Sequence, residues 1–550
     1  MNIRISVKKP VLVVGVLVAE AVDATEKAQT EGSPYSEPAG FCDRGDPVYG
    51  RVLCPVGDKI KTYTHAYTYI NTTGDGQLCP RGRQAMSLNR PAIRPIAARL
   101  AVATAATLNV AEHQAQESTS ISTSVLVYQE SDARVRAVEP MILVTHALPD
   151  ESEISAKLVY DSLTGASPNG AMPASQAQTF TSPSGLNANG LDDDDDEDDS
   201  GDDEEDEEEE AGEGSYTAGA GQKPFDPSFE DTRTLIGLGW EGPVGQDYRV
   251  KLGLEYSTET DYESVSLSAL LERTLNRNNT ELSIGLNVER DTIIPFGDVP
   301  TPLSEYANRS TQGSEATREL MDVMLGVSHV FTRRWLSKFN LSFSYSSGYQ
   351  EDPYKILTVV DDCNLIAHPT VENTWRYAFE SRPETRLKTI LYWQNKIAVN
   401  NRDVLDISTR YMHDDWGIRS GTLNLTGRWH SGKHWYLEPH LRYYRQTAAD
   451  FHTPFLRNGI DIQTSDTGLK PLLDYAASDA RLAAFDATTF GLTLGIQMFD
   501  RHEWSVRAEH YQQHNRNRQR DIPSGSDLDG MAQFTELSAF WVHTSYRIRW

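Results

Sequence analysis

The sequence predicts an all-β fold, a transmembrane antiparallel β-barrel of about 16 strands, and three observations lead to it. The last eleven residues, Phe540 to Trp550, alternate between apolar and polar side chains and end on an aromatic residue. Similar alternating segments, most of ten residues or more, recur from Ser120 onward. The connections between these segments alternate between short and long along the chain. Bacterial outer-membrane barrels have this apolar outside, polar inside, short periplasmic turns and long extracellular loops.

The closing segment shows the alternation without a break. One face carries Phe540, Val542, Thr544, Tyr546, Ile548 and Trp550, and the other carries Trp541, His543, Ser545, Arg547 and Arg549. Successive side chains of a strand point to opposite sides, so the first set is predicted to face lipid and the second the lumen. The same pattern places Leu282, Ile284, Leu286 and Val288 outside, with Ser283, Gly285 and Asn287 inside.

Sixteen segments are predicted as strands, within a range of about 14 to 18 because such boundaries err by a few residues. They are 120–129, 136–147, 153–162, 231–240, 247–256, 262–273, 279–290, 319–331, 335–348, 385–397, 403–412, 419–429, 435–446, 487–499, 504–511 and 538–550. The short connections are 148–152, 241–246, 274–278, 332–334, 398–402, 430–434 and 500–503. The long ones include 163–230, 291–318, 349–384, 447–486 and 512–537. This parity places both termini in the periplasm.

A soluble β-sandwich would show the same alternation, with its apolar face turned inward. Strand length favours the barrel, because soluble strands average five or six residues and a tilted membrane strand needs about nine to eleven. Aromatic residues also gather near the strand ends, as interfacial girdles would require. They are Tyr345, Tyr349, Tyr392, Trp393, Tyr411, Trp416, Trp429, Trp435, Tyr443, Tyr444 and Trp504.

The formal charge of −28 is concentrated in one segment, since Asp192 to Glu210 holds 17 acids in 19 residues. Such a tract repels itself and buries nothing, so 187–230 is predicted to be a disordered acidic extracellular loop. The tract lacks the spacing of a defined calcium loop. No metal site is therefore predicted, beyond weak diffuse cation binding at Asp192, Asp193, Asp194, Asp195 and Asp196.

The start of the chain allows two interpretations. Arg4, Lys8 and Lys9 precede an apolar run that could be a signal peptide beginning at Met1. A second candidate begins at Met86, and we favour it because 25–85 shows no strand alternation. The expected domains are thus an N-terminal extension 1–85, non-native or disordered, a signal peptide 86–115 and the barrel 116–550. The four cysteines, Cys42, Cys54, Cys79 and Cys363, match no zinc or redox spacing.

Three segments carry a resemblance to a known family. They are Ser346-Ser347-Gly348-Tyr349-Gln350-Glu351-Asp352-Pro353-Tyr354-Lys355, Asp414-Asp415-Trp416-Gly417-Ile418-Arg419-Ser420 and Leu441-Arg442-Tyr443-Tyr444-Arg445-Gln446-Thr447-Ala448-Ala449-Asp450-Phe451. Together they resemble the bacterial family called domain of unknown function 3570, over about residues 116–550. The resemblance implies an outer-membrane barrel with no established activity. It also implies an envelope redox or assembly partner, because members are encoded near a flavin-transferase lipoprotein and a thioredoxin-like protein.

Charged residues of these segments are predicted to lie near strand ends on the long-loop side. They are Asp352, Lys355, Asp414, Asp415, Arg419, Arg442, Arg445 and Asp450. The lipid face penalises charge, so these residues are expected at the rim or in the lumen. They are interpreted either as a network that holds the shape of the outer mouth or as a ligand or constriction site, since rings of charge select ions in pores.

The sequence lacks the motifs of hydrolases, zinc proteases and nucleotide-binding enzymes, so no enzyme, catalytic residue or cofactor is predicted. The acidic balance and the absence of a basic stripe disfavour nucleic acid. The predicted function is a porin-like channel of the Gram-negative outer membrane, exported through a signal peptide. The alternative is a non-channel scaffold or sheath for an envelope partner. Further expected partners are outer-membrane lipid and the barrel-assembly machinery, which would bind the strand Phe540 to Trp550.

Overall fold

The computed structural model describes residues 119–131, 134–174, 176–185, 214–361, 376–465, 468–499, 501–516 and 536–550. The predicted N-terminal extension 1–85, the predicted signal peptide 86–115, the acidic tract 192–210 and all four cysteines lie outside these residues. Among the described residues, no helix is long and apolar enough to cross a membrane.

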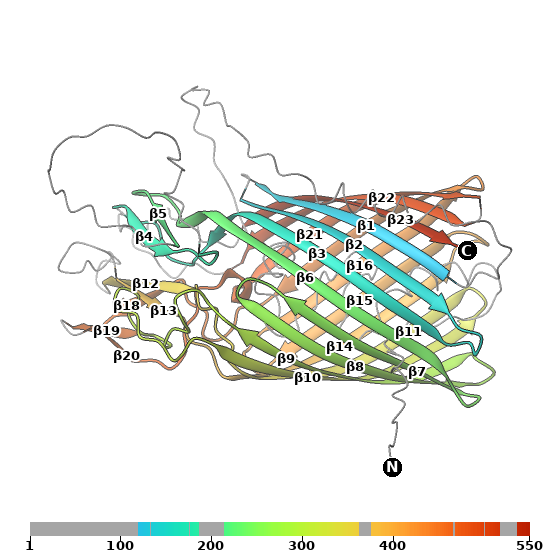
Figure 1. The fold of residues 1–550 in the computed structure, drawn as a ribbon, viewed down its shortest axis with the longest axis horizontal. Coiled ribbons are helices and arrows are strands. Elements are labelled where there is room, and N and C mark those ends of the chain that lie inside the picture. The colour runs from blue at the N-terminus through green and yellow to red at the C-terminus, as the bar shows by residue number, and fades with distance from the viewer. Residues whose placement is uncertain are drawn as a thin grey trace, which may run out of the picture.

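Sixteen antiparallel strands form a closed barrel, in which each strand pairs with the next and the last pairs with the first (Figure 1). They are β1 (Thr119–Glu130), β2 (Val135–Ala147), β3 (Glu153–Pro168), β6 (Phe225–Val244), β7 (Tyr248–Thr258), β8 (Tyr262–Leu275), β9 (Thr280–Ile293), β10 (Ala316–Thr332), β11 (Trp335–Gly348), β14 (Thr385–Ala398), β15 (Val404–Asp414), β16 (Arg419–Ser431), β17 (Trp435–Gln446), β21 (Phe485–Met498), β22 (His502–Asn515) and β23 (Leu537–Arg549). The predicted fold class and strand number are confirmed.

The largest boundary differences lie at the long-loop end of two strands. Pairing of β3 with β6 continues as far as Pro168 and Phe225, past a register shift after Gly165. The sequence predicted these strands to end at 162 and to begin at 231. Hydrophobic alternation marks only the part of a strand that crosses lipid, so the extension beyond it left no such signal. Part of the loop 187–230, predicted to be disordered, is thus ordered strand.

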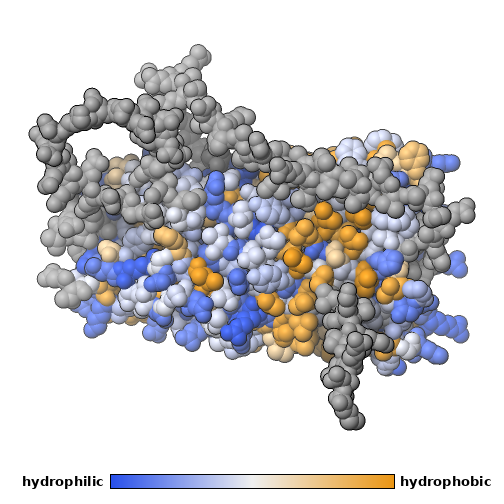
Figure 2. Space-filling model, in the orientation of Figure 1, coloured by the Kyte–Doolittle hydropathy of each residue, from blue (hydrophilic) through white to orange (hydrophobic). Residues whose placement is uncertain are grey.

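The apolar face of the barrel strands points outward, which excludes the sandwich alternative. Pairing aligns Leu271, Ile284, Leu325, Leu341 and Leu391 in one lateral row across five strands. Four of them are among the exposed large hydrophobic residues, and Ile284 is 50% exposed. On the face seen in Figure 2, apolar side chains gather in a band across the barrel, nearer its short-turn end. Such an apolar outer surface fits contact with lipid. Together with the closed barrel, this surface suggests an outer-membrane location.

Two small sheets occupy the long-loop end (Figure 1). One pairs β4 (Gln178–Thr181) with β5 (Ser215–Ala218). The other has the order β13 (Tyr377–Phe379), β12 (Ile356–Asp361), β18 (Phe455–Asn458), β19 (Ile462–Ser465) and β20 (Gly468–Pro471). A 3₁₀ helix, η3 (Ala480–Leu482), follows β20. The sequence did not predict these elements, because strands of three to six residues show too little alternation to be distinguished from loop.

The five-stranded sheet joins two outer loops that are far apart in the sequence. Its parallel pair, β12 and β18, brings loop 349–384 beside loop 447–484. Leu357, Val359, Leu456 and Ile462 are fully buried in a core of their own. The outer loops therefore form a folded layer at one end of the barrel.

Candidate functional site at the outer mouth and in the lumen

Asp414, one of the predicted network residues, forms a buried ion pair at the outer mouth. It ends β15, where it lies opposite Lys388 of β14, and Arg386 is two residues before Lys388 on the same strand. The Arg386 guanidinium donates through Nε and Nη2 to Oδ2 of Asp414 at 3.0 and 2.6 Å. The Ile418 backbone N–H donates to the other carboxylate oxygen at 2.7 Å. Asp414 thus links two strands and the turn that follows β15.

Asp352 and Lys355 lie in a second buried group with four residues that the sequence did not single out. We call this group the mouth cluster, and it consists of Asp352, Lys355, Glu380, Arg382, Asp479 and Arg481. All are buried except Arg481, whose side chain is 16% exposed. Two outer loops contribute to it, 349–384 and 447–484.

Ion pairs hold the mouth cluster together across the two loops. Arg382 donates to Asp479 at 2.8 Å and lies 2.7 Å from Glu380 Oε1. Arg481 donates to Asp352 at 3.0 Å and through Nε to Asp479 at 2.6 Å. Each loop thus presents both signs of charge to the other, so separating the loops would leave buried charges unpaired.

Lys355 and Glu380 complete the cluster through the backbone. The Lys355 ammonium donates to the carbonyl oxygen of Pro168, at the end of β3. The Asp352 backbone N–H donates to Glu380 Oε1 at 2.5 Å. The cluster therefore also ties the outer loops to the barrel wall.

Burial shifts the protonation of these groups. Desolvation raises the pKa of Glu380 to about 8, although the charge of Arg382 acts in the opposite direction. Desolvation also lowers the pKa of Lys355. The pKa of Asp479 is instead lowered, because the attraction of Arg481 and Arg382 outweighs the desolvation of its carboxylate. Asp479 is the anion around which both arginines are arranged.

The remaining five predicted residues lie outside these two groups. Asp415 is exposed and accepts the Leu387 backbone N–H at 3.0 Å. Asp450 and Arg419 are exposed beside the same turn, with backbone bonds from Asp450 N–H to the Trp416 carbonyl and from Arg419 N–H to Thr447 Oγ1.

Arg442 is half-buried on the lumenal face of β17, and Arg445, 53% exposed, lies 3.6 Å from Asp486. The structure therefore separates the eight residues into a paired part, an exposed rim and one lumenal arginine.

The members of the mouth cluster that were missed lie in irregular backbone. Glu380 and Arg382 flank an isolated bridge, and Asp479 caps η3 by accepting the Arg481 backbone N–H. Neither segment shows strand alternation. The only local signal is the aspartate two residues before an arginine, which is common in exposed turns as well.

The segment around η3 packs against the inner wall of the barrel. Ala477 and Leu482 belong to one buried cluster with the wall residues Leu320, Met324, Ile390 and Met412. Gln446, on β17, donates through Nε2 to the carbonyl oxygens of Arg481 and Ala483 at 2.9 and 2.6 Å. Loop 447–484 therefore folds into the outer end of the lumen.

The lumenal face is polar and its charges are unevenly distributed. The lumenal positions of β7 to β10 carry more acids than bases, namely Glu255, Glu272, Glu281, Glu289, Asp291 and Asp322 against Arg249, Lys251 and Arg318. Those of β11 to β17 carry more bases, namely Lys338, Arg386, Lys388, Lys396, Arg410, Arg428 and Arg442 against Asp406, Asp414 and Glu438. We call these the acidic wall and the basic wall. They meet between β10 and β14, where Asp322, Ser344 and Lys388 lie in one lateral row.

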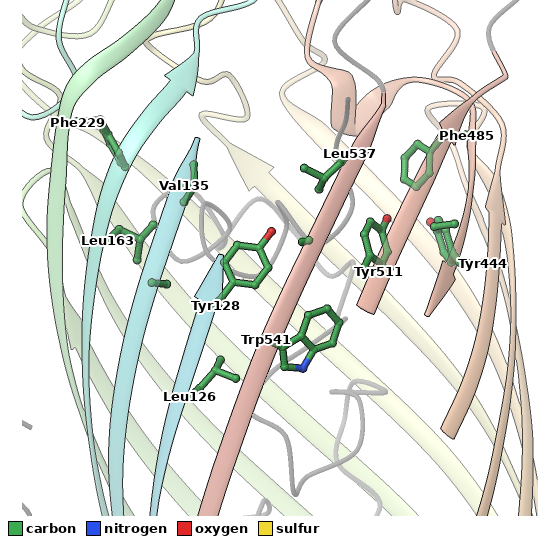
Figure 3. Packing of buried hydrophobic residues seen from close by; sticks show 13 residues of the cluster. Leu126, Tyr128, Val135, Leu163, Phe229, Tyr444, Phe485, Tyr511, Leu537 and Trp541 are labelled. Carbon is green, nitrogen blue, oxygen red and sulfur yellow. The ribbon is translucent and has the colours of Figure 1, made fainter. Parts of the chain in front are cut away.

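A third part of the inner wall is apolar. Thirteen buried residues from β1, β2, β3, β6, β17, β21, β22 and β23 form one cluster, which includes Tyr128, Tyr444, Phe485, Tyr511 and Trp541 (Figure 3). The hydroxyl groups of Tyr444 and Tyr511 each donate at 2.6 Å to a glutamine two residues further along the strand. Because these hydroxyl groups are satisfied, the rings pack as apolar groups.

Within the part of the chain that the structure describes, one group of carboxylates could hold a metal ion. Oxygen atoms of Asp231, Glu259 and Asp261 lie within 4.8 Å of one another where β6 meets the turn after β7. Carboxylate oxygens suit hard cations such as Ca²⁺. Arg233 lies 3.9 Å from Glu259, and Asp231 accepts from Thr260, so the residues present already balance part of this charge. The five aspartates predicted to attract cations, Asp192 to Asp196, lie outside the described residues.

The predicted aromatic girdle is confirmed in part. Tyr345, Trp393, Tyr411, Trp429, Trp435, Tyr443 and Trp504 are exposed on the outer surface. Trp416 and Tyr444 are instead buried at the mouth and in the lumen. Tyr392 also lies on the lumenal face, since it pairs with the lumenal positions Asn340 and Arg410. Proximity to a strand end does not decide which side of the wall a ring faces, and for these three residues the girdle interpretation was wrong.

No curated protein matches the chain in sequence. Similar solved structures include a bacterial polysaccharide outer membrane secretin, with a TM-score of 0.36, 9% identity, and coverage of 80% of this chain and 100% of that one. The siderophore receptor PirA from Acinetobacter baumannii has a TM-score of 0.33 and 8% identity, with coverage of 74% of this chain and 54% of that one. The CymD monoaromatic hydrocarbon channel has a TM-score of 0.32 and 7% identity, with coverage of 80% of this chain and 90% of that one. Likeness at this level does not indicate a shared solute or partner. The family model described as "Protein of unknown function (DUF3570)" matches residues 92–548, and the chain therefore belongs to this family.

Proposed function

We propose that this protein is a channel for small hydrophilic solutes in the outer membrane. The observation that carries the proposal is the lumenal surface of the barrel, which is lined over its middle by small or polar residues. They include Gly237, Gly239, Gly253, Ser268, Gly285, Gly326, Ser342, Ser408 and Gly491. Barrels of 16 strands have room for an aqueous passage when no loop or domain fills it. Small side chains keep such a passage wide.

The outer mouth would limit the size of the solute. Loop 447–484 packs on the inner wall through Ala477 and Leu482, and the mouth cluster fastens it to loop 349–384. A solute entering from outside therefore has to pass this folded layer. We expect a narrow or gated passage rather than the wide opening of a general porin.

The two charged walls would give the passage its selectivity. An excess of acids on β7 to β10 beside an excess of bases on β11 to β17 produces a field across the lumen. Charged side chains that line a pore set which ions and dipolar solutes pass. We expect dipolar solutes to align in this field.

The proposal includes a route to the membrane. Export through a signal peptide within 86–115 and recognition of the strand Phe540 to Trp550 by the barrel-assembly machinery remain predictions from the sequence. The outer face of β23 supports the second, because it presents Phe540, Val542, Tyr546 and Ile548. An envelope redox partner remains a prediction from the family resemblance.

Single-channel recording of the full chain in planar bilayers tests the proposed channel. The wild type is compared with a mouth-cluster variant, Asp479→Asn combined with Arg481→Gln, which removes charges that hold the two loops together. Arg445→Gln, at an exposed rim pair, is the matched control. We expect stable steps from the wild type, larger steps from the mouth variant, and wild-type steps from the control.

Folding of each variant is established first by its heat-dependent migration in detergent gels. A silent bilayer from folded wild type and folded mouth variant alike would overturn the channel and favour the scaffold. Conductance steps of equal size in all three proteins would support the channel proposal but contradict the proposal that the mouth cluster limits the passage.

A further inference from the structure

The turns at the periplasmic end of the barrel carry an uneven set of charges. Five basic residues lie in four turns between β8 and β22, namely Arg277, Arg333, Arg334, Lys433 and Arg501. The turn between β14 and β15 adds Arg402, which donates to the Gly432 carbonyl oxygen of the neighbouring turn. Five consecutive turns of the barrel thus carry at least one basic residue. In two of these turns an acid is adjacent in the sequence, Asp403 after Arg402 and Asp500 before Arg501, whereas the other three hold basic residues without an acid.

The other two turns at this end have the opposite sign. The turn after β2 holds Asp150 and Glu151, and the turn after β6 holds Asp247, with no lysine or arginine in either. Positive charge is therefore confined to one arc of the rim. A rim adapted only for solubility would not require this segregation.

The five basic side chains are available for binding. All are exposed, and the part of the chain described by the structure contains no ion pair to any of them. Arg277 lies in a turn where three consecutive residues, Asn276, Arg277 and Asn278, have positive φ angles of 55°, 57° and 65°. Asparagine tolerates this backbone better than arginine does, so the local backbone does not explain the arginine.

A belt of aromatic residues lies next to these turns on the lipid-facing surface. Trp335, Trp393, Trp429, Trp435 and Trp504 are 40–50% exposed, and Phe331 stacks on Trp335 with ring centres 4.5 Å apart. Exposed tryptophans mark the level of the lipid headgroups. Arg333 and Arg334 lie between Phe331 and Trp335, and Lys433 lies between Trp429 and Trp435. At about 3.3 Å per residue, the charges are within one headgroup layer of the belt.

We infer that this basic arc binds the phosphate groups of anionic phospholipids in the leaflet facing the periplasm. The arc consists of Arg277, Arg333, Arg334, Lys433 and Arg501. Lysine and arginine at a membrane surface attract anionic lipid, each contributing a favourable electrostatic interaction that salt screens. The aromatic belt fixes the depth at which the charges lie and leaves phosphate as the nearest anion. The arc does not depend on the lumen and goes beyond the proposed channel.

Fluorescence quenching by brominated lipids measures this preference directly. The full chain is refolded into vesicles of phosphatidylcholine containing either brominated phosphatidylglycerol or brominated phosphatidylcholine. Quenching of the belt tryptophans gives the relative binding of the two lipids. In the charge variant, R333Q, R334Q, K433Q and R501Q are combined with R277N, which retains tolerance of positive φ. The control combines D150N, E151Q and D247N on the acidic turns.

We expect the wild type and the control to prefer phosphatidylglycerol by about threefold or more at low salt, and less at high salt. The charge variant is expected to show no preference. Equal quenching by both lipids in the wild type would overturn the inference, as would a preference that survives in the charge variant or in high salt. Heat-dependent gel migration shows that each protein is folded. If phosphatidylglycerol is not preferred but the wild type alone sediments with peptidoglycan, the arc binds the cell wall and the lipid assignment is wrong.

Discussion

At the scale of single residues, the structure separates charges that look equivalent in the sequence. Asp414 and Arg445 both belong to the segments that carry the family resemblance. Asp414 is fully buried against Arg386, whereas Arg445 is 53% exposed and lies 3.6 Å from a partly exposed Asp486. A buried ion pair that loses one partner leaves the other charge uncompensated, whereas an exposed pair is screened by water and salt. Their contributions to stability should therefore differ widely.

We expect Asp414→Ala to lower the free energy of unfolding by about 3 to 5 kcal/mol, because it leaves Arg386 buried without its carboxylate. Arg445→Ala should cost no more than about 1 kcal/mol. Urea titration of the full chain in lipid vesicles measures both. Equal losses would mean that the buried pair is not the stabilising contact that its geometry indicates.

At the scale of elements, the outer loops are folded structure fastened by charge. Loops 349–384 and 447–484 share the five-stranded sheet and the mouth cluster. Glu380 lies among Asp352, Arg382, Asp479 and Arg481, and Glu351 and Lys355 are on the same loop. Four acids and three bases meet there, and every one of their side chains except that of Arg481 is buried. The stability of this arrangement should therefore depend on pH.

The sign of that response follows from Glu380. Its pKa rises from 4.5 to about 8 in the folded mouth, so between these values the folded state retains a proton that the unfolded state releases. The stability linked to this proton is fully present below pH 4.5 and is lost as the pH rises through 8. We expect the difference in urea midpoint between Glu380→Gln and the wild type to grow from pH 5 to pH 9 in favour of the variant.

Asp479 provides the contrast, because its lowered pKa makes its contribution present at neutral pH and lost only in strong acid. Asp479→Asn should therefore lower the midpoint at pH 5 and at pH 9 alike. A difference between Glu380→Gln and the wild type that stays constant over this range would show that Glu380 does not carry the proton.

At the scale of the whole molecule, the barrel reverses the arrangement of a soluble β-protein, because its apolar rows face outward and its charged and polar rows face inward. The lateral row through Leu271, Ile284, Leu325, Leu341 and Leu391 is part of that outer surface. Lipid penalises charge at such a position in a depth-dependent way.

We expect Leu325→Arg to reduce the free energy of folding into vesicles by about 2 to 4 kcal/mol. Leu325→Phe, which lipid accommodates, should leave that free energy nearly unchanged. The folded fraction on unheated detergent gels, followed through a urea titration, reports both values. A tolerated arginine would contradict the placement of this row against the hydrocarbon core.

Much of the barrel could be predicted from the sequence. Every predicted strand corresponds to a barrel strand, and the seven short connections are the seven turns of one end. The lipid-facing sets are the exposed ones, for example Leu282, Ile284, Leu286 and Val288. Two-residue periodicity determines this result locally, because a strand that separates lipid from a polar lumen must alternate along its whole length.

The mouth was decided only by tertiary structure. Of the eight predicted network residues, Asp352, Lys355 and Asp414 are buried. Asp352 pairs with Arg481, 129 residues away, and Asp414 pairs with Arg386, 28 residues away. Lys355 donates to the carbonyl oxygen of Pro168, 187 residues away. Irregular loops have no period from which pairing can be inferred. Which charges meet there depends on how β12 and β18 align, and that is set by the burial of their shared core. The sequence by itself determined the wall of the barrel, and long-range packing decided what lies across its entrance.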